Sequence, residues 1–467
     1  MTAASKSDPR SLSPLERFLL VFTEVRPGEG GIALLLFANV FLILCSYYFV
    51  KPLREGWIAV AGIASLSKME VKAYSSFGQS VLLLPVVWFY GHLADRFRRS
   101  ALITRATLFC LSNMVVFWFL QPDFFIQNLP GTGIAFYLWV GMFGVFVVAQ
   151  FWAFAADVYT DEQGRRLIPL VAIGATAGAA MGSWITDIFV SGKIVPTEYL
   201  LIAAMIPLAL SLVLTRLVDA RQMAKAGAQK AKKADDVGRG ALGLVFRTPF
   251  LLAVGAITLL LSWVNTNGEN LLFRVVQEVL EQQATARGIS GDASILEFTR
   301  DGTTAFYGNF FFWVNICALV LQAVVASRLL KYGGFGVALL MLPVIALVSY
   351  STMWVLPVLA VVKMMKIAEN ATDYSINNTA RHVLWLPVSA EMKYKGKPAI
   401  DSLFVRVGDG LAALTVLVGV QFLALQTKTF FAFNVFLVIA WIAASVAVVG
   451  QHRRFSAAAK EDERLSA

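Results

Sequence analysis

Long apolar runs dominate the sequence and restrict the folds that the chain can adopt. Each run has about the 20 residues that an α-helix needs to cross a lipid bilayer. We place twelve of them, at residues 31–52, 73–93, 101–121, 133–157, 167–190, 198–218, 249–272, 304–328, 335–353, 354–377, 400–425 and 430–450. In the bilayer core every backbone polar group needs an internal partner, which a helix provides. The sequence therefore predicts an all-α polytopic membrane protein with twelve transmembrane helices.

The composition supports this fold class. Apolar residues make up 58% of the chain, charged residues make up 15%, and the mean hydropathy is +0.67. A soluble domain does not need so much apolar residue. The net charge of +10 is compatible with nucleic-acid binding, but Lys and Arg also accumulate in the cytoplasmic loops of membrane proteins. We therefore expect membrane lipid, and no nucleic acid, as the surroundings of this chain.

The basic residues also predict an orientation. They gather after the second, fourth, sixth, eighth, tenth and twelfth apolar runs, which makes these loops and both termini cytoplasmic. We expect the chain to lie in a bacterial inner (plasma) membrane. The first external segment is an exception, because it carries Lys51, Arg54, Lys68 and Lys72.

The loop at 219–248 divides the apolar runs six and six, which predicts two related halves. We expect a cytoplasmic tail with a short amphipathic helix at 1–30, an N-terminal six-helix bundle at 31–218, a cytoplasmic linker at 219–248, a C-terminal six-helix bundle at 249–450 and a cytoplasmic tail at 451–467. The external segment at 273–303 mixes Glu, Gln, Gly, Asp and Arg, and we expect a small helix and a mobile loop there.

Small residues recur in the fifth run. Gly174, Gly178 and Gly182 lie four residues apart, so a helix places them on one face. Small residues at this spacing let two helix backbones approach closely. We expect this face to serve helix packing.

The tenth run carries charges that are unusual inside a bilayer. A helix places Lys363, Lys366 and Asn370 on one stripe, and each lysine there costs roughly 2.5–3.5 kcal/mol on insertion scales. A wet cavity that binds an anion would offset this cost. The sequence therefore predicts a transporter of an anionic small molecule. Glu369 keeps a second interpretation open, in which it forms a structural ion pair with Lys366.

One loop segment, between the second and third runs, reads Gly91-His92-Leu93-Ala94-Asp95-Arg96-Phe97-Arg98-Arg99. It resembles the loop Gly-x-Leu-Ala-Asp-Arg-x-Gly-Arg-Arg of the major facilitator superfamily, with Phe97-Arg98 in place of x-Gly. The resemblance implies a major-facilitator-like 6+6 arrangement of helices. It also implies that Asp95, Arg96 and Arg99 take part in gating the cytoplasmic side. The alternative is an ordinary basic loop.

Three further segments are similar to the ATP/ADP translocases, a nucleotide transporter family related to the major facilitators. They are Arg26-Pro27-Gly28-Glu29 with Lys51-Pro52-Leu53-Arg54-Glu55, Asn370-Ala371-Thr372-Asp373-Tyr374-Ser375, and Lys393-Tyr394-Lys395-Gly396-Lys397-Pro398-Ala399-Ile400-Asp401 with Arg406-Val407-Gly408. The resemblance implies exchange of nucleotides across a membrane by alternating access. Residues 376–382 depart from the family pattern, which leaves another anionic cargo open.

The resemblance makes Lys51 a candidate binding lysine, and snorkelling at a helix end is the alternative for Lys51 and Arg54. Our hypothesis is that Lys51, Arg54, Lys363 and Lys366 bind phosphate groups, while Glu269 and Glu369 adjust the charge of these cations. Asn370, on the same stripe as the two lysines of the tenth run, completes the predicted substrate-binding set. An ion-coupled major facilitator carrier of another organic anion or amphiphile, and a non-transporting membrane scaffold or sensor, are the alternative functions.

The chain lacks the motifs of the enzyme classes that were considered. It has no Gly-x4-Gly-Lys-Ser/Thr phosphate loop and no Gly-x-Ser-x-Gly elbow. His92, His382 and His452 do not have metal-ligand spacing. We therefore predict neither an enzyme nor a cofactor or metal site.

Overall fold

The computed structural model describes residues 13–20, 23–63, 65–96, 99–122, 131–223, 241–389 and 391–466. Helices account for most of these residues, and the described part contains no β-strand. The first half comprises α1 (Pro14–Leu19), α2 (Gly30–Val60), α3 (Lys68–Arg96), α4 (Arg99–Phe119), α5 (Thr132–Val158), α6 (Asp161–Ser191), a short 3₁₀ helix η2 (Thr197–Tyr199) and α7 (Leu200–Met223).

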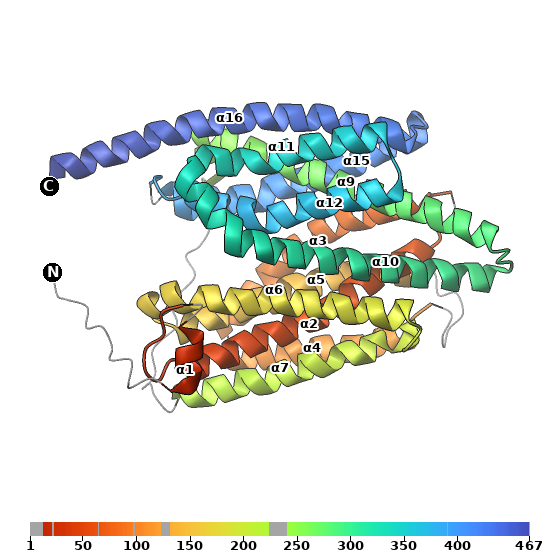
Figure 1. Ribbon diagram of the computed structural model, residues 1–467, viewed down its shortest axis with the longest axis horizontal. Helices are drawn as coiled ribbons and strands as arrows, with labels where there is room; N and C mark the ends of the chain where they lie inside the picture. Colours follow the sequence, from red (N-terminus) through yellow and green to blue (C-terminus); the bar gives the residue numbers. More distant parts are fainter. Residues whose placement is uncertain are drawn as a thin grey trace.

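The second half follows residues 224–240. It comprises α8 (Ala241–Arg247), α9 (Pro249–Ala286), α10 (Asp292–Val320), α11 (Gly334–Val355), α12 (Leu359–Thr372), α13 (Asn378–Leu384), α14 (Lys397–Ala399), α15 (Val405–Leu417) and α16 (Thr427–Ser466). Short π-helical segments interrupt its helices: η3 (Leu321–Ala326), η4 (Leu329–Gly333), η5 (Asp373–Asn377), η6 (Met392–Gly396), η7 (Ile400–Phe404) and η8 (Val418–Phe422). The two halves form two bundles side by side, with their long helices roughly along one direction (Figure 1). The predicted all-α membrane fold is therefore confirmed.

Ten helices of the described chain are long and apolar enough to cross a membrane. Two further helical stretches are long enough to cross a membrane, but they are not apolar enough to be counted among these ten. These are α3, with Lys68, Glu70 and Lys72 in its first turns, and the run from α12 to α13, which carries Lys366 and Glu369. The count of twelve spans therefore stays a prediction, because composition supports ten of them.

Local sequence signals set several helix ends. Thr160 and Gln163 form a capping box at the start of α6. Pro357 lies in the break between α11 and α12, a few residues after the boundary that the sequence analysis placed between residues 353 and 354. By contrast, the prediction of a separate small helix within residues 273–303 was wrong, since α9 continues to Ala286 and α10 begins at Asp292, with a short loop between them. Glu, Gln and Ala between 277 and 286 are good helix formers, and they extend α9 beyond its apolar part.

Helices α2 and α6 pack closely through the glycines of α6. A Cβ atom built on Gly178 would lie 2.1 Å from the backbone oxygen of Phe41, and one on Gly182 would lie 2.3 Å from that of Cys45. Gly174 meets Phe37 one turn earlier in the same way. The predicted packing role of this glycine face is confirmed. Three successive turns of α6 thus contact three successive turns of α2, and both helices belong to the first half.

The short helix α1 closes one end of the first half. Glu16 accepts hydrogen bonds from the backbone of Ser13, as its capping pattern predicts, and also from that of Gly28 at 2.7 Å. Nearby, Arg166 of α6 forms an ion pair with Glu29 at 2.9 Å. Burial opposes the charged form of Glu29, but hydrogen bonds from Arg166 and from the Arg26 backbone outweigh it and lower the pKa of this carboxyl. These contacts tie the start of α2 to the start of α6.

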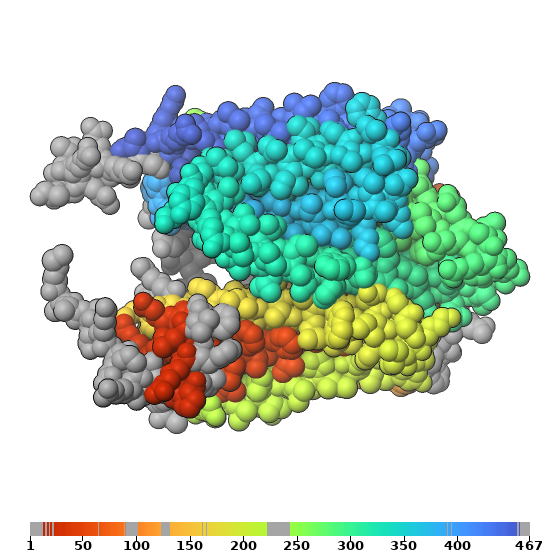
Figure 2. All heavy atoms as spheres, viewed as in Figure 1, coloured from red at the N-terminus to blue at the C-terminus, as the bar shows by residue number. Residues whose placement is uncertain are grey.

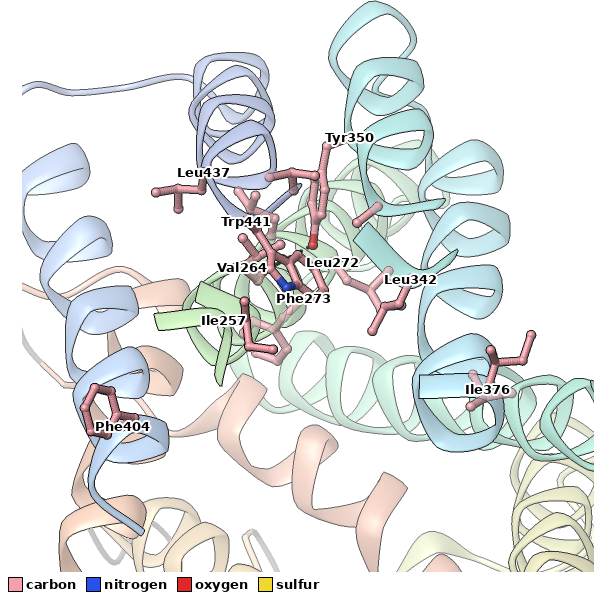
Figure 3. Packing of buried hydrophobic residues seen from close by; sticks show 14 of the residues in the cluster. Ile257, Val264, Leu272, Phe273, Leu342, Tyr350, Ile376, Phe404, Leu437 and Trp441 are labelled. Carbon is pink, nitrogen blue, oxygen red and sulfur yellow. Dashed lines mark hydrogen bonds between the residues drawn. The ribbon is translucent and has the colours of Figure 1, made fainter. Parts of the chain in front are cut away.

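The core of the second half forms around α9. Figure 3 shows Val264, Leu272 and Phe273 of α9 beside Tyr350 of α11 and Trp441 of α16. The Tyr350 hydroxyl donates a hydrogen bond to the backbone oxygen of Val264 at 3.2 Å. This helix-to-helix packing surrounds the stretch of α9 that carries Glu269 and thereby fixes its position.

The two halves meet along a seam formed by α2, α3 and α6 on one side and by α9, α10 and α15 on the other. We call the end of the molecule where α1 and the end of α16 lie the α1 end (Figure 1). At this end Figure 2 shows a hollow between the halves, while the rest of the visible seam is closed. At the opposite end α2 and α10 are in close contact, because a Cβ on Gly56 would lie 2.1 Å from the Thr304 hydroxyl.

The glycine face of α6 leads to a first prediction. Replacing Gly178 with Ala puts a methyl group against the α2 backbone, so α2 and α6 must separate, at a cost of about 1–3 kcal/mol for overpacking. Thermal unfolding of the purified protein should occur at a lower temperature. Gly450→Ala is the matched control, since Gly450 is also helical but has open space around it. Equal unfolding temperatures for the two variants would contradict the packing role.

Candidate functional site

Lys366 lies at the centre of a buried cluster in the second half. Its side chain is fully buried, and its ammonium lies 3.0 Å from Glu369 of the same helix and 3.6 Å from Glu269 of α9. Tyr350 donates to Glu369 at 3.3 Å, and Asn370 donates to Glu269 at 2.9 Å. Two carboxylates therefore compensate one ammonium, and Glu269 is the less buried of the two, with 26% of its side chain exposed.

A second buried cluster lies in the first half and reaches across the seam. Glu55 of α2 binds Lys72 of α3 at 2.9 Å and Arg54 at 2.5 Å. The Lys72 ammonium also donates to the Tyr307 hydroxyl of α10 at 3.3 Å and to the backbone oxygen of Glu269 at 3.4 Å. Lys72 thus connects both halves, and a carboxylate of its own half compensates its charge.

Lys51 differs from the other cations of the site. Its ammonium lies 3.9 Å from the ring centre of Phe311 and 4.9 Å from that of Tyr48. Within the described residues no carboxylate lies within ion-pairing distance of it. Aromatic faces attract a cation by about 0.5–2 kcal/mol, whereas removing one member of a buried ion pair costs about 3–5 kcal/mol. An anion beside Lys51 would therefore not have to displace a carboxylate of the described residues.

Lys363 takes part in a bridge between the halves. Its ammonium donates to the side-chain oxygen of Asn309 at 2.6 Å, and the Asn309 amide donates to Asp187 of α6 at 2.7 Å. Asn309 belongs to α10, so the bridge runs from α12 through α10 to the first half. Lys363 and Lys366 lie about 6 Å and about 10 Å along α12 from its first residue, Leu359.

Together these side chains form what we call the central charged network, which comprises Lys51, Arg54, Glu55, Lys72, Glu269, Lys366 and Glu369. It contains four cations and three carboxylates. One positive charge is left without a carboxylate, and the contacts assign it to Lys51. The network has the charge to attract an anion into the seam.

The sequence analysis did not assign Lys72 and Glu55 to the site. Lys72 was counted with an external loop, whereas it lies in α3 with 3% of its surface exposed. The available signal was the excess of basic residues in the first external segment, which the orientation rule does not explain. Glu55 directly follows Arg54 in the motif. Its position on α2 near an intramembrane lysine could have indicated that it belongs to the site.

Polar contacts hold the halves together at the end opposite α1. Arg300 of α10 binds Glu198 of the first half at 2.8 Å and donates to the backbone oxygen of Pro122. Lys68 pairs with Glu281 at 2.9 Å. Gln421 of η8 donates to Glu70 of α3 at 2.6 Å, which adds a third polar link. These contacts close the seam beyond the central charged network.

The gating residues predicted from the loop lie at the α1 end. Asp95 and Arg96 are the last residues of the described part of α3, and Arg99 is the first residue of α4. Their side chains fall outside the part of the chain that the structure describes. Their gating role stays a prediction.

Comparison with known proteins identifies the class. Among solved structures, the POT family transporter PepTSo matches with a TM-score of 0.60 at 12% identity, covering 91% of this chain and 98% of that chain. The nucleoside transporter NupG matches with a TM-score of 0.56 at 12% identity, covering 90% of this chain and 99% of that chain. The chain therefore shares the fold of these structures, which is the major-facilitator-like arrangement that the sequence predicted.

Sequence comparison narrows this class. The profile described as TLC ATP/ADP transporter matches residues 349–452. The "ADP,ATP carrier protein 5" of Rickettsia felis is 20% identical, covering 91% of this chain and 95% of that protein. The "ADP,ATP carrier protein 1" of Chlamydia trachomatis serovar D is 25% identical over 22% of this chain, and the chain spans only 24% of that relative's length. The resemblance to the ATP/ADP translocase family is therefore confirmed.

The Lys366 cluster gives a second prediction. Lys366→Met leaves Glu369 and Glu269 without their shared cation, and we expect a loss of about 3–5 kcal/mol in the free energy of unfolding. Adding Glu369→Gln removes one of the two uncompensated charges and should restore a large part of the loss. Chemical unfolding of the purified protein measures both. A double variant as unstable as Lys366→Met would show that charge compensation is not the reason.

The contacts that cross the seam at the opposite end give a third prediction. In a variant without native cysteines, Thr304→Cys places a thiol between α2 and α10. Adding Arg300→Gln should speed its labelling by a maleimide about fivefold, since losing about 1 kcal/mol shifts the equilibrium toward the open seam by that factor. Arg274→Gln is the matched control, because Arg274 pairs with Glu278 within α9. Equal labelling rates in the two variants would exclude a gating role for Arg300.

Proposed function

We propose that the protein exchanges adenine nucleotides across a bacterial inner (plasma) membrane by alternating access. The observation that carries the proposal is Lys51, an ammonium at the seam that lies against aromatic faces and has no carboxylate within ion-pairing distance among the described residues. The resemblance to ATP/ADP carriers supports nucleotide as the cargo. The two bundles, at 31–218 and 249–450, rock against each other around the central charged network.

The cations of the network have different roles in this proposal. Lys51 binds a phosphate group directly, because no carboxylate has to be displaced first. Arg54 joins it when the phosphate competes with Glu55 for the guanidinium, while Lys72 keeps Glu55 compensated. The Arg54 guanidinium carbon also lies 4.3 Å from the ring centre of Tyr137, and this contact orients the guanidinium. These steps are electrostatic and require no covalent chemistry.

The second half supplies the other part of the site. Lys366 stays paired with Glu369, and Glu269 is free to move away from Lys366 because that contact is the longer one, at 3.6 Å. A phosphate near Lys366 replaces Glu269, which Asn370 then holds by its amide. Lys363 adds a contact when the cargo displaces Asn309. The site thus exchanges internal ion pairs for contacts with the cargo.

The proposal includes an orientation. Both termini lie in the cytoplasm, so the hollow at the α1 end faces the cytoplasm and the contacts around Arg300 close the external side. The basic residues of the loops support this orientation. In this conformation the cargo exchanges with the cytoplasm, and Asp95, Arg96 and Arg99 act when the cytoplasmic side closes.

A second candidate is an ion-coupled carrier of another organic anion. Glu269 and Glu369 favour it, because two carboxylates beside one lysine in the membrane interior could take up a proton during transport. In that case a proton gradient drives uptake into vesicles that contain no internal cargo. Exchange, by contrast, requires cargo on both sides.

The fourth prediction tests the exchange. In proteoliposomes loaded with ADP, the wild-type protein should take up external labelled ATP, and Lys51→Gln should reduce this uptake by about 100-fold, since a phosphate loses its charged partner in a poorly solvated site. Lys428→Gln is the matched control, because Lys428 is exposed at the opposite end. Uptake driven by a proton gradient without internal ADP would instead support the second candidate. Absence of nucleotide uptake by the wild type would remove nucleotide exchange.

A further inference from the structure

A second polar cluster lies in the seam, away from the central charged network. Asp409 of α15 is 8% exposed and accepts hydrogen bonds from Ser262 and Thr266 of α9, both at 2.8 Å. Its other oxygen accepts a hydrogen bond from Ser80 of α3, which belongs to the first half. Three neutral hydroxyl groups from two neighbouring helices therefore solvate this carboxylate.

Arg406, one turn earlier on α15, is only weakly engaged with this carboxylate. Its Nη1 lies 3.4 Å from Asp409 and donates to the Ser80 hydroxyl at 3.0 Å. Charge-assisted hydrogen bonds between nitrogen and oxygen are normally about 2.7–2.9 Å long. The Nε atom of Arg406 is shielded from solvent and has no acceptor within hydrogen-bonding distance among the described residues. One buried N–H group of the guanidinium is thus unused within the described chain.

Arg406 lies between the central charged network and the hollow at the α1 end. Ser80 follows Lys72 by eight residues on α3, about 12 Å along the helix. Since α3 runs from the opposite end toward the α1 end, Arg406 lies on the α1 side of the central charged network. That is the side of the hollow in Figure 2. The Arg406 side chain is 25% exposed, so part of it can be reached.

We propose that Arg406, together with the Ser80 hydroxyl, is a second anion site, which binds one phosphate group of the cargo between the hollow and Lys51. The site spans the seam, since Arg406 and Ser80 belong to different halves, and a phosphate oxygen there bonds to both. A bidentate contact with phosphate suits the planar guanidinium. The buried Nε obtains an acceptor when the guanidinium turns toward the anion. The inference rests on the proposed transport of a phosphate-bearing cargo.

The competing explanation is that Arg406 only neutralises Asp409. The two explanations differ in a double variant. If Arg406 serves Asp409 alone, then Arg406→Gln with Asp409→Asn removes both charges and restores both stability and transport. If Arg406 binds the cargo, the double variant regains thermal stability, but the KM for ADP stays raised about tenfold, as expected for one lost hydrogen bond to a charged group.

The experiment combines counterflow with a thermal-shift assay on the full chain, using ADP and inorganic pyrophosphate as probes. We expect both probes to stabilise the wild type, and Arg406→Gln to reduce this effect, with partial recovery in Arg406→Lys. Stabilisation of Arg406→Gln by pyrophosphate to the wild-type extent, or a normal KM in the double variant, would overturn the Arg406 site alone. Stabilisation of the wild type by pyrophosphate but not by ADP would support the anion site and count against nucleotide as cargo. No stabilisation of the wild type by either probe would overturn both proposals.

Discussion

The structure depends on how charged side chains are neutralised where its two halves meet. An isolated charge in a medium of low dielectric constant is costly, and a partner or water has to offset that cost. Lys72 illustrates this requirement. It is almost fully buried, and its ammonium contacts Glu55 of its own half and Tyr307 of the other half. The seam can therefore hold charge without being open to solvent at every point.

The cations differ in whether their partners belong to the same half or to the other half. Lys366 and Lys72 are compensated by carboxylates of their own half, so their ion pairs can persist while the halves move. Arg300 and Lys68 pair across the seam, so their contacts must break when the opposite end opens. Lys51 belongs to neither group, because aromatic rings contact it. In the proposed function, its charge is available to a mobile anion without breaking an ion pair of the described residues.

The sequence predicted the class of fold, the glycine face of α6 and the helical stripe of α12, because apolar length and helical spacing are local properties. It did not predict how charges pair across the seam, since a pair such as Lys72 and Tyr307 joins residues distant in the chain. It also counted Lys72 as part of a loop, because its apolar run begins just after that residue. Burial of a charge beside distant partners is a tertiary property, and no local pattern encodes it.

Alternating access places opposing demands on the seam, and the close contacts show how this chain meets them. Helices α2 and α6 are packed backbone to backbone through Gly174, Gly178 and Gly182, so the first half can move as one rigid body. Between the halves, the contacts are more varied: glycine approaches at Gly56, Gly308 and Gly410, an aromatic contact between Tyr48 and Phe311, and polar links at the opposite end. Polar links of this kind are individually worth little when water can replace them. In the proposed rocking motion, water can therefore replace these polar links at the opposite end, while the packing of α2 against α6 keeps the first half together.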